Sequence, residues 1–275
     1  MTTRKNFFAA FSILTLLFVF LATGCKKDDD DDTPLAQTSY DMKVKDVLGI
    51  TGTVIFYKRT NSTTVEITLN GVSSGNHPAH IHLNSAVETG GISITLNPVD
   101  ATGKSATSVT MLDNNTPITY EDLLVFDGYI NVHESASNLG VIISQGDIGA
   151  NKLTGASKSY NLTTVDSSGV AGTVLFEKRN SNKTLVTISL DGTITGGTHP
   201  AEIHLGDVNT VGGGPVVVTL NSVDGATGKS YSNIRNLING TAITYDDWVV
   251  YDGYVNVLES LANPSSILCQ GNIGE

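Results

Sequence analysis

The histidines of this chain are its best candidates for chemistry, because their spacing is that of metal ligands. All six lie in or beside two motifs. His80 and His82 alternate within the sequence HPAHIHL, and His133 ends the sequence GYINVH. Residues two apart on a strand share a face, which would set the Cα atoms of His80 and His82 about 6.5–7 Å apart. At that spacing both imidazoles can bind one ion at about 2.0 Å.

A third imidazole would complete such a site. If the two motifs form neighbouring strands, His133 joins His80 and His82, and three imidazoles suit copper or zinc. Their nitrogen atoms would then converge to within about 4 Å of one another. The alternative is that these are exposed strand histidines that only form hydrogen bonds. Accessory candidates lie beside the three histidines or at the corresponding positions of the second motif: His77, Glu134, His199, Glu202 and His204.

Sequence motifs of several common functional classes are absent from the chain. It contains no HExxH zinc motif, no EF-hand loop and no dinucleotide-binding fingerprint. The formal net charge of −11 argues against a nucleic-acid partner. We therefore name no catalytic residues and favour a non-enzymatic protein over an enzyme.

The histidine motifs belong to an internal repeat. HPAHIHL from His77 recurs as HPAEIHL from His199, and GYINVHES recurs as GYVNVLES. The repeats are roughly 120 residues apart, which is too long for a solenoid unit and indicates two tandem globular domains. We place these domains at residues 37–149 and 150–275.

The second repeat lacks two of the three imidazoles. Glu202 stands where the first repeat has His80, and Leu258 stands where it has His133. The fold therefore does not need three imidazoles, and the first repeat is free to use them for a separate role.

The elements that position these residues are predicted to be strands. Apolar residues such as Val54 and Phe56 alternate with polar neighbours, and glycine, asparagine and aspartate punctuate the chain at short intervals. About seven short strands per repeat predict an all-β protein of two immunoglobulin-like or Greek-key β-sandwiches. Thr119 and Thr244, each followed three residues later by aspartate, predict one helical turn per domain. The Asp-Gly pairs that end at Gly128 and Gly253 are interpreted as tight turns, where φ can be positive.

The N-terminus is typical of a secretory signal. A basic start precedes an almost unbroken apolar run over residues 7–23, and small residues lead to Cys25. A transmembrane anchor is the alternative, because the run approaches the roughly 17–25 residues that span a bilayer. Two lysines directly after Cys25 lie on the side that would be translocated, which weighs against an anchor. We assign residues 1–24 to a signal peptide.

Residues 21–25, LATGC, resemble the lipobox of bacterial lipoproteins, which implies cleavage before Cys25 and lipid attachment to its thiol. The run of aspartates at 28–32 is typical of a disordered tether, which we place at residues 25–36. A lipidated cysteine followed by acidic residues is similar to the surface-export signal of Bacteroidota lipoproteins. The resemblance implies an outer-membrane lipid anchor, a chain exposed at the cell surface, and membrane lipid as its first partner.

The remaining cysteine is expected to be structural. With Cys25 acylated, Cys269 would be the only free thiol, so no disulfide can form within the chain. It follows Leu268 in an apolar, strand-like run, where a small buried packing residue is expected.

Both repeats resemble CHRD domains, a module named from chordin and found in bacterial secreted proteins. The resemblance rests on residues 79–82 (AHIH), 129–133 (YINVH) and 214–220 (GPVVVTL), and it covers residues 37–149 and 157–275. It implies an immunoglobulin-like β-sandwich, and the closing strands depart from the family in having glutamine where arginine is frequent. On this resemblance we expect a surface-anchored, non-enzymatic module that binds an extracellular protein, glycan or matrix ligand.

The histidine pattern is also similar, more weakly, to copper–zinc superoxide dismutase. In that family an H-x-H strand and a later V-V-H-E strand supply three copper ligands, and His80, His82 and His133-Glu134 follow the same order. The bridging histidine, the zinc-loop ligands and the active-site arginine have no counterparts here. Copper or zinc binding by the first domain is therefore the alternative function, and dismutase activity is not expected.

Overall fold

A computed structural model describes residues 33–72 and 74–274, which form strands along most of their length. The predicted signal peptide, Cys25 and the aspartate run lie outside the described residues. Within the part of the chain that is described, no helix has the length and apolar character needed to cross a membrane.

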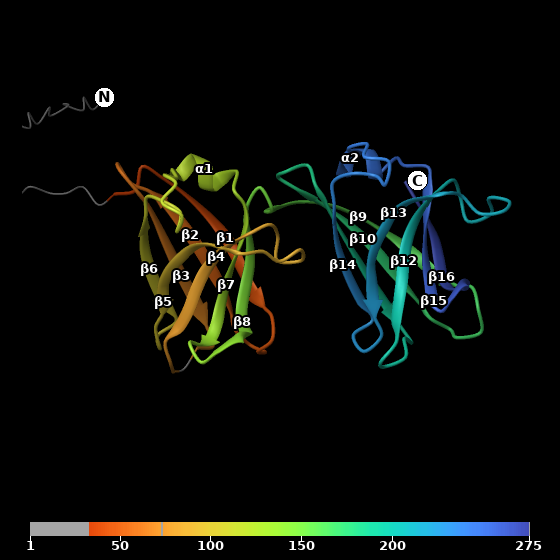
Figure 1. Ribbon diagram of the computed structural model, residues 1–275, viewed down its shortest axis with the longest axis horizontal. Helices are drawn as coiled ribbons and strands as arrows, with labels where there is room; N and C mark the ends of the chain where they lie inside the picture. The colour runs from red at the N-terminus through yellow and green to blue at the C-terminus, as the bar shows by residue number, and fades with distance from the viewer. Residues whose placement is uncertain (1–32, 73, 275) are drawn as a thin grey trace, which may run out of the picture. The chain divides into compact units, whose positions relative to one another are not determined.

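The first domain is one antiparallel sheet of eight strands, with the short helix α1 (Tyr120–Leu124) packed at one end (Figure 1). The strand order is β5-β4-β7-β8-β1-β2-β3-β6. The strands are β1 (Ala36–Val44), β2 (Thr51–Lys58), β3 (Thr63–Asn70), β4 (His77–Leu83), β5 (Ile92–Val99), β6 (Lys104–Val109), β7 (Asp127–Ser135) and β8 (Asn138–Gly149).

The second domain repeats this order and closes it into a barrel. The sequence of neighbours is β10-β11-β14-β13-β12-β15-β16-β9, and a pairing of Asp224 with Lys229 joins β13 to β14. The helix α2 (Tyr245–Trp248) corresponds to α1. The strands are β9 (Leu153–Thr164), β10 (Ala171–Arg179), β11 (Thr184–Asp191), β12 (Thr198–Leu205), β13 (Val216–Asp224), β14 (Lys229–Ile234), β15 (Gly253–Ser260) and β16 (Asn263–Ile273).

Each domain has a hydrophobic core of its own, built from the alternating residues of its strands. Val54 and Phe56 of β2 are fully buried in the first core, and Val174 and Phe176 take the same positions in the second. Alternate residues of a strand point to opposite faces, so the period of two in the sequence becomes an apolar inner face and a polar outer face. The predicted all-β class and the two domains are confirmed.

The number of strands per domain is eight, one more than the estimate from the sequence. Strands such as β9 are exposed along most of their length, so they carry little of the alternation on which that estimate relied. The two helical turns are confirmed: Thr119 and Thr244 each cap a helix, in a reciprocal capping box with Asp122 and Asp247.

The interpretation of Gly128 and Gly253 as turn residues is wrong, because both lie in strands and neither has a positive φ. Gly128 is the second residue of β7 and has no positive φ. A Cβ at this position would lie 2.5 Å from the ring of Phe126 and 2.7 Å from the carbonyl oxygen of His82. Glycine is needed there because β7 lies so close to β4, the strand that carries two of the candidate ligands.

Candidate metal centre

The structure brings His80, His82 and His133 together on the outer face of the first domain. His80 and His82 lie on β4 and His133 lies on β7, and these strands are antiparallel neighbours with His80 opposite Asn131. One nitrogen from each of the three imidazoles falls within 4.8 Å of the others. Within residues 33–72 and 74–274, this is the cluster of three or more histidine, cysteine or acidic side chains that could hold a metal ion.

Two irregularities in strand pairing aim the ligands. The β4–β5 pairing shifts between Ile81 and His82, and the β7–β8 pairing shifts between Val132 and His133. Such bulges bend a strand and redirect its side chains, and they are frequent beside functional sites. Ile81 and Val132 remain fully buried in the core, so the shifts redirect the histidines without disturbing the apolar face.

Backbone carbonyl groups fix the protonation of two imidazoles. His82 donates its Nδ1–H to the carbonyl oxygen of Gly90 at 3.0 Å, and His133 donates its Nδ1–H to that of Leu139 at 2.7 Å. A carbonyl oxygen can only accept, so each Nε2 carries a free lone pair. This is the outer-sphere arrangement found around metal-bound histidines.

Two of the remaining nitrogens are buried and unpartnered. Nε2 of His82 and Nδ1 of His80 have no hydrogen-bond partner among the described residues and are shielded from solvent. His82 and His133 are 8% and 7% exposed, and His80 is half-buried. A buried nitrogen without a partner is costly, and a metal ion bound between the rings would satisfy it.

The electrostatics of the cluster favour neutral imidazoles. Burial lowers the pKa of His80, and the neighbouring rings of His133 and His82 lower it further. Burial also lowers the pKa of His82, with a smaller lowering by His133, and outweighs the hydrogen bond to Gly90, which raises it. Neutral imidazole is the form that binds metal, so the groups that lower these pKa values also prepare the site.

The three nitrogens lie near the spacing that coordination requires, at no more than 4.8 Å from one another. The limit of 4.8 Å is looser than the spacing of about 4 Å expected from the sequence. Three nitrogens at about 2.0–2.1 Å around one ion are about 3.6 Å apart in a trigonal array. The ring centroids lie 5.2 to 6.3 Å from one another, so rotations that move each nitrogen by about 1 Å or less would complete the site.

The accessory residues of the first domain do not join the cluster. His77 is buried with Nδ1 at 2.7 Å from the carbonyl oxygen of Glu134 and Nε2 at 2.8 Å from that of Ser74. Both of its nitrogens therefore contact carbonyl groups, which makes it a structural link between β4 and β7. The carboxylate of Glu134 is exposed and accepts a hydrogen bond from Asn138.

The corresponding place in the second domain holds a different set of side chains. Glu202 stands at the position of His80, and one of its carboxylate oxygens lies 3.3 Å from Nε2 of His204. Leu258 is buried at the position of His133. His199 resembles His77, because its Nδ1 lies 2.8 Å from the carbonyl oxygen of Glu259.

Sequence reasoning overlooked three groups around the first site. Two are the carbonyl oxygens of Gly90 and Leu139, which no residue-type pattern reveals because every residue has one. The third is Asp113, whose carboxylate accepts two hydrogen bonds from Thr95, the residue paired with His80. A signal was available, because Asp113 corresponds to Ile238 in the second repeat.

Comparison with known proteins bears on the first domain. No curated protein matches the chain. Residues 38–145 match the family described as CHRD domain, which confirms for the first repeat the resemblance seen in its sequence. The domain that holds the three imidazoles is therefore a CHRD domain.

Proposed function

We propose that the first domain binds one copper or zinc ion through His80, His82 and His133. The observation that carries this proposal is the pair of Nδ1–H donations to the carbonyl groups of Gly90 and Leu139. They orient two imidazoles from different strands so that both Nε2 lone pairs are free, and they hold the rings in that state before an ion arrives.

The surroundings support a bound ion over a merely hydrogen-bonded cluster. His77 contacts carbonyl groups through both of its nitrogens. Nδ1 of His80 and Nε2 of His82 instead remain buried and unpartnered on two neighbouring rings. The ring of Tyr129 stacks on His82 at 5.0 Å between centroids, which restricts the imidazole to one orientation.

Three imidazoles suit copper and zinc, and they leave at least one coordination position for water or another small ligand. The site would therefore bind an ion without enclosing it fully. The second domain shares the strand order, and we propose that it is a second CHRD-like domain without this site, so that the chain binds one ion.

Calorimetric titration of the full chain in detergent, purified without a histidine tag, tests this function. Zn²⁺ or Cu²⁺ should bind the wild-type chain with a stoichiometry of one, and the variant combining His80→Ala and His133→Ala should lose this binding. His204→Ala is the matched control in the second domain and should leave the titration unchanged. Indistinguishable titrations of the wild type and the double variant would disprove the proposal.

We further propose that Cys25 carries a lipid that anchors the chain to the outer membrane with its domains outside the cell. The support is the sequence alone: the LATGC segment and the aspartate run that follows it. Incorporation of a labelled fatty acid should depend on Cys25 and disappear in Cys25→Ala. Labelling that persists in the variant would contradict the anchor.

A further inference from the structure

Asp113 changes between the two domains together with the metal ligands. Three residues of the site, Tyr129, Asn131 and His82, are the same in both repeats. Three other positions differ: His80 becomes Glu202 and His133 becomes Leu258, which removes two imidazoles, and Asp113 becomes Ile238, which removes a carboxylate. The aspartate therefore belongs with the residues that are special to the first site.

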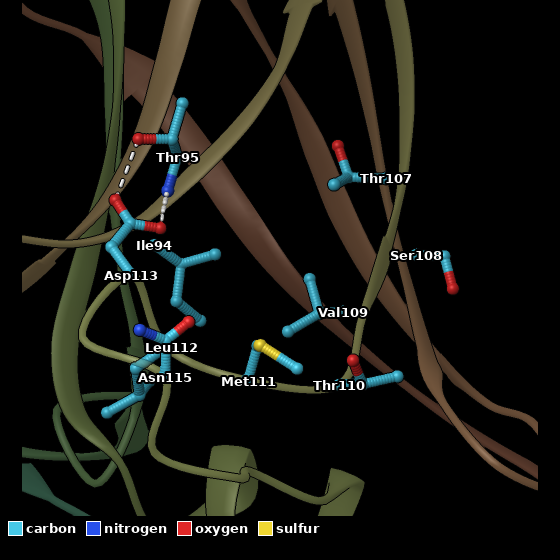
Figure 2. A pocket seen from close by; sticks show the side chains of 10 residues that line it. All are labelled: Ile94, Thr95, Thr107, Ser108, Val109, Thr110, Met111, Leu112, Asp113 and Asn115. Atoms are coloured by element: carbon cyan, nitrogen blue, oxygen red, sulfur yellow. Dashed lines mark hydrogen bonds between the residues drawn. The ribbon is translucent and has the colours of Figure 1, made fainter.

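The structure fixes the carboxylate of Asp113 on Thr95, the residue opposite His80. One carboxylate oxygen accepts the backbone N–H of Thr95 at 3.0 Å, and the other accepts the Thr95 hydroxyl at 2.8 Å (Figure 2). The backbone N–H of Asp113 donates to the carbonyl oxygen of Ser93 at 2.9 Å. Thr95 is the direct cross-strand partner of His80, so these three hydrogen bonds hold a negative charge over the ligand strand.

The carboxylate of Asp113 can act on an ion at His80 because the residue that it bonds, Thr95, lies directly opposite His80. A fixed negative charge attracts a nearby cation, so the carboxylate favours an ion bound to His80.

Water screens this interaction, which limits its size. Asp113 is exposed and lines a shallow groove of about 260 Å³ together with Thr95, Thr107 and Met111 (Figure 2). Interactions of exposed charges weaken as the ionic strength rises. The effect of Asp113 on a bound cation should therefore depend on salt.

We propose that Asp113 supplies the negative charge of the metal site and makes the site prefer a divalent ion over Cu⁺. This inference rests on the proposed function. Three neutral imidazoles add no charge. The occupied site therefore carries two positive charges with a divalent ion and one with Cu⁺. The attraction to a fixed carboxylate is proportional to the charge of the ion. Removing the carboxylate should therefore reduce the affinity for a divalent ion by the square of the factor lost for Cu⁺.

Competition with chromophoric chelators measures both affinities in the full chain. Asp113→Asn keeps the shape of the side chain and removes its charge. Asp113 bonds to no ligand, and an exposed pair of unit charges typically changes an affinity by less than about fivefold. We expect about a threefold loss for Cu⁺ and about a tenfold loss for Zn²⁺ in dilute buffer, both shrinking as salt is added.

Two variants control the experiment. Asp113→Glu keeps the charge and should restore most of the Zn²⁺ affinity. Asp100→Asn removes a carboxylate from the turn after β5, where it bonds to Thr102, and should leave both affinities unchanged.

The outcomes separate this inference from the function on which it rests. Equal losses for Zn²⁺ and Cu⁺, or no loss for either ion, would overturn the role of Asp113 while leaving the metal site intact. A wild-type chain that binds neither ion would overturn both.

Discussion

The two domains have the same strand order but differ in what lies on the outer face of β4 and β7 and of their counterparts β12 and β15. The first domain gathers three imidazoles there. The second pairs Glu202 with His204 at 3.3 Å and fills the remaining place with Leu258. The outer face is therefore variable, because the core that holds each domain together lies on the opposite side of the strands.

What the domains retain is as informative as what they change. His82 and His204 each donate Nδ1–H to a glycine carbonyl, at 3.0 and 2.8 Å. Each also stacks on a tyrosine, at 5.0 and 4.9 Å between centroids. One oriented histidine is thus part of the shared scaffold, and a metal site requires the two further imidazoles that only the first repeat provides.

The pairing shifts are shared as well. The second domain shifts between Ile203 and His204 and between Val257 and Leu258, at the positions that correspond to those of the first. Because the backbone already has the required bends, the second domain should need only side-chain changes to become a metal site.

Introducing a metal site into the second domain would remove the difference between the domains. This change should have the largest effect, which is on the number of ions bound. Glu202→His with Leu258→His places three imidazoles on the same bends and removes the carboxylate that occupies His204. We expect the full chain to bind two Zn²⁺ ions in place of one, as measured by calorimetric stoichiometry and elemental analysis.

Glu202→His alone is the control, because it provides two imidazoles and should leave the stoichiometry at one. If the double variant folds but still binds one ion, the shared bends are not sufficient to aim the ligands. Metal binding would then require a further residue that the second domain lacks. Adding Ile238→Asp tests whether that residue is the counterpart of Asp113.

A smaller effect should follow from exchanging a buried residue that differs between the cores. Cys269 corresponds to Ser144 of the first domain, which donates its hydroxyl to the carbonyl oxygen of Lys43 at 3.0 Å. Cys269 is free and fully buried, as its apolar surroundings predicted. Cys269→Ser should lower the free energy of unfolding by about 1 kcal/mol at pH 7, because a hydroxyl replaces the thiol in an apolar site.

This difference should reverse in alkaline solution. Burial raises the pKa of the Cys269 thiol to about 12, whereas an unfolded chain loses that proton near pH 8.5. The neutral thiol therefore stabilises the folded wild type fully below about pH 8.5, and that contribution is lost as the pH rises towards 12. The serine variant cannot ionise at this position. Ionisation of the thiol favours the unfolded wild type by about 2 kcal/mol at pH 10, so urea unfolding should show the wild type more stable at pH 7 and the serine variant more stable at pH 10. A difference that stays constant would mean that Cys269 is not protected from ionisation.

The local sequence was enough to predict the architecture because strand alternation depends on burial of near neighbours. Val54 and Phe56 mark an inner face whatever the strand order is, and Thr119 with Asp122 determines a helix cap within four residues. The prediction failed at Gly128, where the constraint comes from a strand distant in sequence. The sequence does not distinguish a glycine that is required because a side chain would not fit from a glycine that is required by a turn.

The sequence by itself determined the class of the fold, the duplication and the identity of the three histidines, because each is encoded in residue type and short-range period. The tertiary structure decided that β4 and β7 are neighbours and that the carbonyl groups of Gly90 and Leu139 orient the rings. It also bonded Asp113 to Thr95, the residue opposite His80. These facts depend on strand order and on backbone atoms that every residue shares, so no pattern of side chains along the chain could have specified them.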